Sequence, residues 1–190
     1  MDNITANITE EVINVDIVSE EVNIDFGFGF LPVSGYYLGA YSTDNQTCPS
    51  ATQAYPIHFS EVYTQKGINL VDNSKIVFTA SGMYNLAFSL QYTNKATNAV
   101  YDADVWARVN GVNAPFTNSQ TSIPTKHAGI NGHAITAVNF IGPFNAGDYV
   151  ELMWSSNGDG NVLIETIGPQ TNPARPAAPG IILTVWRILP

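Results

Sequence analysis

The chain has 190 residues, of which 45% are hydrophobic and 12% are charged, so it can build the core of a domain of ordinary size. Its net charge of −9 argues against nucleic acid and against an anionic membrane as partners, because both bind through basic patches. The single cysteine excludes an intrachain disulfide, and no apolar run is long enough for a transmembrane helix.

Residues 1–30 differ in composition from the rest of the chain. They carry seven acids and no base, which leaves nine acids against seven bases in residues 31–190. A disordered acidic tail is one interpretation. However, β-branched and polar residues alternate with a period of two, which predicts extended strand. Because this segment has no evident partner within the chain, we expect an anchoring arm that adds a strand to another molecule. Its anchoring residues are Ile13, Val15, Ile17, Val22, Ile24 and Phe26.

The remaining residues, 31–190, are predicted to form an all-β domain after a hinge at residues 27–32. No window shows a sustained helical period, whereas short alternating runs recur between Gly, Asn, Asp and Pro. This spacing favours a sandwich or barrel over β-α-β units. The strands are expected at residues 54–59, 67–71, 74–79, 82–93, 101–109, 112–116, 134–141, 148–155, 162–167 and 180–188.

The longest predicted strand has two contrasting faces. Tyr84, Leu86, Phe88, Leu90 and Tyr92 point one way and make a bulky core face. The opposite face is small and polar, so it is our candidate for close approach at a symmetry axis; its residues are Asn85, Ala87, Ser89 and Gln91.

Two later segments are equally informative. Asn110-Gly111 lies between strand-like runs and predicts a tight hairpin, because both central residues of that turn need positive φ. Residues 181–189 are apolar on both faces, which predicts a central strand buried on both sides. In a two-layer sandwich only one face of each sheet is inside, so another subunit is expected to cover the second face.

Four runs resemble strands of the tumour necrosis factor and complement globular-head superfamily and of phage structural proteins that carry such domains. They are Ile76–Leu86, Trp106–Gly111, Phe144–Leu152 and Ile182–Val185, and the resemblance spans about residues 36–190. It implies a ten-stranded jelly roll that assembles as a tight trimer. The chain departs from that pattern in a longer loop at residues 117–133 and a Pro-rich loop at residues 169–179, and it lacks acids that match the calcium site of the complement heads.

Candidate catalytic and metal-binding residues give weak signals. Five residues, two of them glycines, separate His127 from His133, and no acid lies close to them in the sequence. This pattern predicts a solvated loop rather than a zinc site. Asp102 and Asp104 share one side of a strand, as edge charges do, and residues 157–161 resemble a turn more than a calcium loop. Cys48 is expected to be passive. The sequence therefore predicts no enzyme, no cofactor and no metal.

Two functions remain from this reasoning. The arm resembles the attachment segments of virion proteins, so the first is a homotrimeric bacteriophage decoration (cement) protein on the outer capsid surface. Its partner would be the major capsid protein or another virion subunit. The second is the head of a short phage fibre, which binds a host glycan or receptor through its long loops. Thirty residues are too few for a fibre shaft, which favours decoration.

Overall fold

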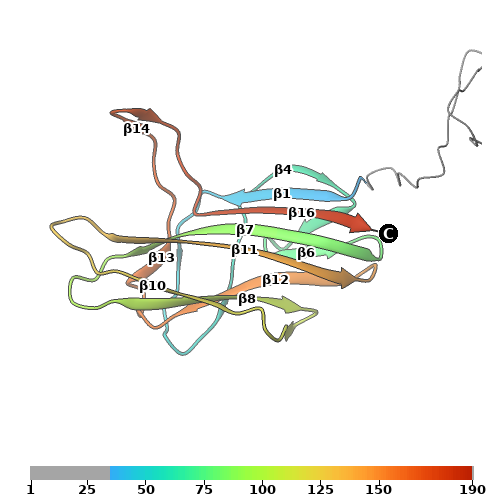
Figure 1. The fold of residues 1–190 in the computed structure, drawn as a ribbon, viewed down its shortest axis with the longest axis horizontal. Coiled ribbons are helices and arrows are strands. Elements are labelled where there is room, and N and C mark those ends of the chain that lie inside the picture. Colours follow the sequence, from blue (N-terminus) through green and yellow to red (C-terminus); the bar gives the residue numbers. More distant parts are fainter. Residues whose placement is uncertain (1–34, 190) are drawn as a thin grey trace, which may run out of the picture. The chain divides into compact units, whose positions relative to one another are not determined.

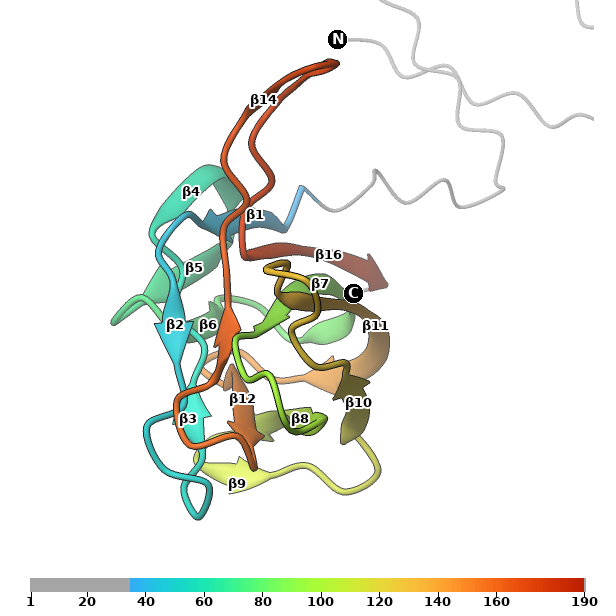
Figure 2. The same ribbon diagram turned by 90° about the vertical axis from the view of Figure 1, so that its left-hand side faces the viewer.

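The computed structural model describes residues 35–189, which form two antiparallel sheets packed face to face (Figure 1). Sheet A contains β1 (Tyr37–Ser42), β2 (Gln46–Thr47), β4 (Glu61–Lys66), β7 (Gly82–Asn94), β11 (Gly132–Phe144), β13 (Val162–Ile164) and β16 (Ile181–Leu189). Sheet B contains β3 (Tyr55–Pro56), β5 (Ile68–Val71), β6 (Lys75–Phe78), β8 (Tyr101–Val109), β9 (Val112–Asn113), β10 (Ser119–Ile123) and β12 (Tyr149–Ser156). A small hairpin, β14 (Gln170–Thr171) with β15 (Ala174–Arg175), projects from the sandwich (Figures 1 and 2).

The order of the long strands in sheet A is β4-β1-β16-β7-β11. β13 pairs with Tyr92–Asn94 at the end of β7, beyond the residues that pair with β16, and β2 pairs with β13. Sheet B has the order β10-β8-β12-β6-β5, with β9 beside β8 and β3 beside β12. All these strand pairs are antiparallel, which confirms the predicted all-β class, and the described residues contain no helix that could cross a membrane.

The core lies between the two sheets, and the alternation of β7 sets one side of it. The aromatic and leucine side chains predicted to face inward are at most 4% exposed, which confirms the core face; they are Tyr84, Leu86, Phe88, Leu90 and Tyr92. Aromatic contacts join the sheets: the rings of Tyr92 and Trp154 are 6.2 Å apart, and those of Tyr84 and Phe78 are 4.4 Å apart. Each such side chain contributes about 2 kcal/mol by leaving water.

The turn predicted at Asn110-Gly111 is confirmed by its backbone angles. The φ values are +49° for Asn110 and +82° for Gly111, as a two-residue hairpin of the primed type requires. The Asn110 side chain also ties this hairpin to β12, because its amide donates to Asp148 Oδ1 at 2.8 Å and its Oδ1 accepts from the Tyr149 N–H at 2.9 Å.

Several segments differ from the sequence prediction. β1, β2 and β4 were not expected, and the loop predicted at 117–133 contains β10, which pairs with β8 from Ser119 to Ile123. The strand predicted at 112–116 ends at Asn113, since Pro115 has no N–H to donate to a ladder. The predicted Pro-rich loop holds the β14–β15 hairpin, and its proline-stiffened ends suit a projecting ribbon.

β16 lies centrally, between β7 and β1, as predicted. The expectation that it is buried on both sides does not hold for the single chain: Ile181, Leu183 and Val185 are fully buried, whereas Ile182 and Trp186 are 40% and 41% exposed. The second face of sheet A is therefore open.

Candidate interaction face

The open side of sheet A is built from the outward residues of three adjacent strands, β16, β7 and β11. We call it the open face. Its strand register places Ile182 and Ala137 on either side of Ser89, and Thr184 and Asn139 on either side of Ala87. The open face consists of Asn85, Ala87, Ser89 and Gln91 from β7, Ile135, Ala137, Asn139 and Ile141 from β11, and Ile182, Thr184 and Trp186 from β16.

The composition of the open face is unusual for a solvated surface. None of its side chains carries a formal charge, although the chain has a net charge of −9. Ile135 and Ile141 are each 64% exposed, and they lie across β7 from the half-exposed residues of β16. Large exposed apolar side chains on an uncharged sheet face are typical of an interaction site rather than of a surface that faces water.

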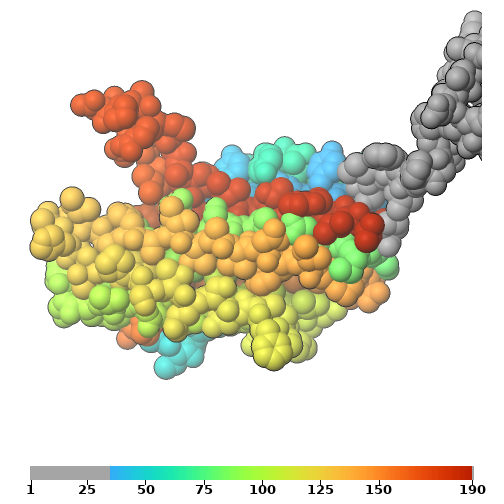
Figure 3. All heavy atoms as spheres, in the orientation of Figure 1, coloured from blue at the N-terminus to red at the C-terminus, as the bar shows by residue number. Residues whose placement is uncertain are grey.

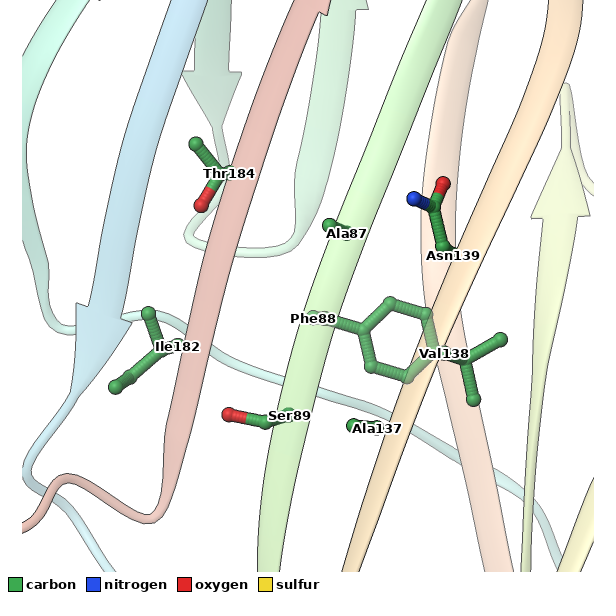
Figure 4. Close-up of a pocket in the computed structure, with 8 residues that line it drawn as sticks. All are labelled: Ala87, Phe88, Ser89, Ala137, Val138, Asn139, Ile182 and Thr184. Carbon is green, nitrogen blue, oxygen red and sulfur yellow. The ribbon is translucent and has the colours of Figure 1, made fainter.

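A shallow hollow of about 400 Å³ lies at the centre of the open face (Figure 4). Its middle is formed by the small side chains of Ala87, Ser89 and Ala137, and β16 contributes Ile182 and Thr184 on one side. The hollow exists because the side chains that β7 and β11 place at these adjacent positions are too small to fill the space. Figure 3 shows the exposed atoms of β16, β7 and β11 side by side on the surface.

Asn85 gives the open face a polar group without a partner. Its side chain is only 3% exposed, and its Oδ1 accepts no hydrogen bond from any described residue. Its cross-strand neighbours are Trp186 and Ile141, neither of which directs a donor to it in the structure. A buried acceptor left unpaired costs about 1–3 kcal/mol.

The open face includes all four residues predicted as axis candidates, Asn85, Ala87, Ser89 and Gln91, and they point away from the core. The predicted arm residues Ile13, Val15, Ile17, Val22, Ile24 and Phe26 lie outside the described residues. Ile135, Ala137 and Ile141 of β11 were not among the predicted site residues, although they belong to a run of the sequence that is apolar on both faces.

The other candidate residues are hydrogen-bonded to neighbouring segments or buried in the domain. Asp102 accepts a hydrogen bond from Ser122, and Asp104 accepts one from the Asn118 amide at 2.8 Å, so both carboxylates bind the strand beside them. Cys48 is fully buried, and burial raises the pKa of its thiol. Within residues 35–189 no group of three His, Cys, Asp or Glu side chains is placed to hold a metal ion.

Residues 157–160 form the predicted turn. In that turn the Asp159 carboxylate accepts from the Ala51 N–H at 2.8 Å, and Asn157 Oδ1 accepts from the Asp102 N–H at the same distance. These side chains thus bind backbone groups of neighbouring segments.

No protein-family model matches this chain, and a search of curated proteins finds no match.

Proposed function

We propose that this chain is a structural protein of a bacteriophage particle: a homotrimeric decoration protein whose head assembles through the open face. In this proposal residues 1–30 dock on the shell and the head stabilises neighbouring shell subunits by burial, without chemistry. The observation that carries the self-assembly is the open face itself, an uncharged surface of exposed apolar and small polar side chains on an acidic chain. Two copies that both carry −9 repel each other least where neither presents a charge.

The strand pairing supports a jelly roll of the proposed type. Eight strands, taken in chain order as β1, β6, β7, β8, β10, β11, β12 and β16, pair from the outside inwards. The first pairs with the last (β1 with β16), and then follow β6 with β12, β7 with β11 and β8 with β10. Such nested antiparallel pairs, distributed over two sheets, are what two interlocked Greek keys produce.

The proposed trimer follows from the open face and from the resemblance to trimeric jelly rolls. A sheet face that lines a closed ring of copies is covered by its neighbours, which would bury Ile135, Ile141 and Trp186. Contact between subunits would then bury the second side of β16, as the sequence predicts.

The proposed docking through residues 1–30 rests on their sequence. Their alternating Ile and Val suit strand addition, and their seven acids would orient the arm toward basic groups on a shell protein. The described chain starts beside the end of β16, where the Arg187 N–H donates to the Tyr36 carbonyl at 3.0 Å. The first described residues of the head thus lie at the end of the sandwich where β16 terminates.

A second candidate function is a receptor- or glycan-binding head, and the projecting hairpin favours it. Residues 168–177 are all exposed and extend away from the sheets (Figure 2). Because an isolated two-stranded hairpin is marginally stable alone, a ligand that packs against this ribbon would stabilise it.

The mass of the full chain in solution tests the assembly. Light scattering should give three times 20.5 kDa. A monomeric mass at all accessible concentrations would contradict the proposed trimer.

Binding to purified empty shells of the source phage tests the docking role. The full chain should bind, and the variant Ile13→Ser, Val15→Ser, Ile17→Ser should remain a trimer but lose binding. A control variant, Asn3→Ser with Asn7→Ser, keeps the alternating residues and should bind normally. Equal binding of all three proteins would refute the arm as the anchor and would direct the search to a ligand of the hairpin.

A further inference from the structure

Phe116 is the most exposed aromatic side chain among the described residues. Its exposure is 105% of the reference value, so its ring contacts almost nothing in its own chain. Its φ is +61°, in the left-handed region that costs a residue with a bulky side chain about 1–2 kcal/mol. An exposed apolar ring on a strained backbone gains nothing within the single chain, and such strain is often associated with a functional contact.

The loop that carries Phe116 is held firmly against β8. The Ala114 N–H donates to the Ala107 carbonyl at 2.9 Å. The Thr117 hydroxyl donates to the Ala114 carbonyl at 2.8 Å and accepts from the Ala107 N–H at 3.1 Å. These three hydrogen bonds fix the loop on both sides of Phe116. The ring is thus held away from the surface in a preorganised position, which lowers the entropy cost of inserting it into a partner.

The loop lies at an edge of the sandwich next to the open face. It joins β9 to β10, both of which pair with the outer edge of β8. β10 in turn touches β11, the edge strand of sheet A, where the hydroxyls of Thr121 and Thr136 are hydrogen-bonded. One chain therefore presents a protruding ring at the edge and a hollow on the face that begins just beyond β11.

Charge makes this edge suited to a second copy of the chain. Between Arg108 and Asp148 only Lys126 carries a formal charge, and β7 carries none. The loop that carries Phe116 and the open face thus have no formal charge, while Asp102 and Asp104 of β8 lie beside β10 at the same edge and are hydrogen-bonded to Ser122 and Asn118. Contact between the loop of one copy and the open face of another therefore brings no like charges together.

We propose that Phe116 of one copy inserts into the hollow lined by Ala87, Ser89 and Ala137 of the next copy. This inference rests on the proposed self-assembly and specifies how the copies meet. The hollow of about 400 Å³ is larger than the cavity of about 150 Å³ that accepts a benzene ring in a protein interior. Because the ring and the hollow are different surfaces, the contact is head-to-tail and closes into a ring of copies when the rotation between them closes.

The first test is the variant Phe116→Ala in the full chain, with Val112→Ala as the matched control. Val112 is 72% exposed on the neighbouring strand β9, so its truncation removes a comparable exposed apolar side chain outside the proposed contact. Light scattering over a concentration series gives the protein concentration at which half of the trimer has dissociated. For Phe116→Ala this midpoint should rise about 100-fold, as for the loss of a central aromatic anchor. Val112→Ala should change it less than about threefold.

Equal midpoints for the two variants and the unmodified trimer would overturn the Phe116 contact while leaving the trimer standing. A monomeric unmodified chain would instead contradict the proposed assembly itself, so the two failures are distinguishable. Thermal unfolding of dilute protein checks the fold: Phe116→Ala should leave the midpoint unchanged, because the ring has no contacts to lose.

The second test maps the contact by crosslinking with a short bismaleimide. Cys48 is fully buried and gives little background. The double variant Phe116→Cys, Ser89→Cys should give covalent dimers and trimers, and each single variant should give neither. Efficient crosslinking of Phe116→Cys alone would place two such loops against each other and would exclude the head-to-tail contact.

Discussion

One buried polar side chain on the outward face of each sheet shows a difference in hydrogen bonding between the two sheets. On sheet B, Glu151 is 5% exposed, and its carboxylate accepts from Arg108 at 2.8 Å and from the Ser74 hydroxyl at 3.1 Å. On sheet A, Asn85 is 3% exposed and its Oδ1 has no donor among the described residues. Both faces bury a polar side chain, but Glu151 has its partners in the same chain, whereas Asn85 Oδ1 has none among the described residues.

The same contrast holds for apolar groups. Met153, next to Glu151 on the outward side of β12, is 2% exposed because β3 pairs beside it at Pro56. Ile135 and Ile141 on the outward side of β11 remain mostly exposed. Sheet B thus completes its surface within one chain, whereas the surface of sheet A is the one that a second copy would complete. Four predictions test this difference, from the largest expected effect to the smallest.

The largest effect is expected from a charge placed on each face in turn. Ser89 and Ser155 are half-buried serines on the outward sides of β7 and β12, so Ser89→Lys and Ser155→Lys are matched variants. Ser89→Lys would bury an unpaired charge in the contact between copies and should weaken the trimer more than about 1,000-fold by sedimentation equilibrium. Ser155→Lys faces Asp104 across the strands and should leave the trimer intact. The reverse ranking would place the interface on sheet B.

The next effect concerns the stability of the single chain. Arg108→Ala would leave the buried Glu151 carboxylate without its ion pair and should lower the free energy of unfolding by about 3 kcal/mol. Lys75→Ala removes a solvent-exposed pair with Asp72 and should lower the free energy of unfolding much less. Urea titration of both variants measures the difference, and similar losses would mean that the Glu151 network is not a buried one.

A smaller effect distinguishes assembly from folding at Asn85. Asn85→Ala removes an acceptor that is unpaired in the single chain, so the free energy of unfolding of dilute protein should change by less than about 1 kcal/mol. Because the Asn85 side chain is already covered by its own chain, the same variant should change the midpoint of trimer dissociation by less than about threefold. Light scattering and urea titration together give both numbers. A large loss in dilute protein would show that Asn85 acts within its own chain.

The smallest effect is a dependence on pH at the β8–β9 hairpin. The Asn145 N–H, followed by the Asn110 amide, holds the pKa of Asp148 below its usual value of 3.8. A carboxyl whose pKa is lower in the folded state stabilises the fold at neutral pH, and this contribution disappears as the pH falls through the folded pKa. Between pH 6 and pH 3 the unfolding midpoint should therefore fall slightly more for the native chain than for Asp148→Asn. Identical slopes would exclude a role for Asp148.

Much of the fold could be predicted from the sequence, because local rules act strongly at particular residues. β7 was predicted within one residue at its end, since five bulky side chains at alternate positions can be buried only by a strand. β4 was missed because Glu61–Lys66 is an exposed edge strand without an apolar face, and its pairing comes from β1. β10 was missed for the same reason: four of its five residues are Ser, Gln or Thr, and its ladder comes from β8.

The candidate site divides in the same way. The sequence alone determined the small outward residues of β7 and the central position of β16, because side-chain alternation and a two-sided apolar run are local properties of the chain. Only the tertiary structure decided that β11 lies beside β7, which brings Ala137 next to Ser89 and creates the hollow. It also decided that Phe116 projects from a hydrogen-bonded loop instead of continuing a strand. Strand order and loop placement depend on contacts between residues far apart in the chain, and no local pattern encodes them.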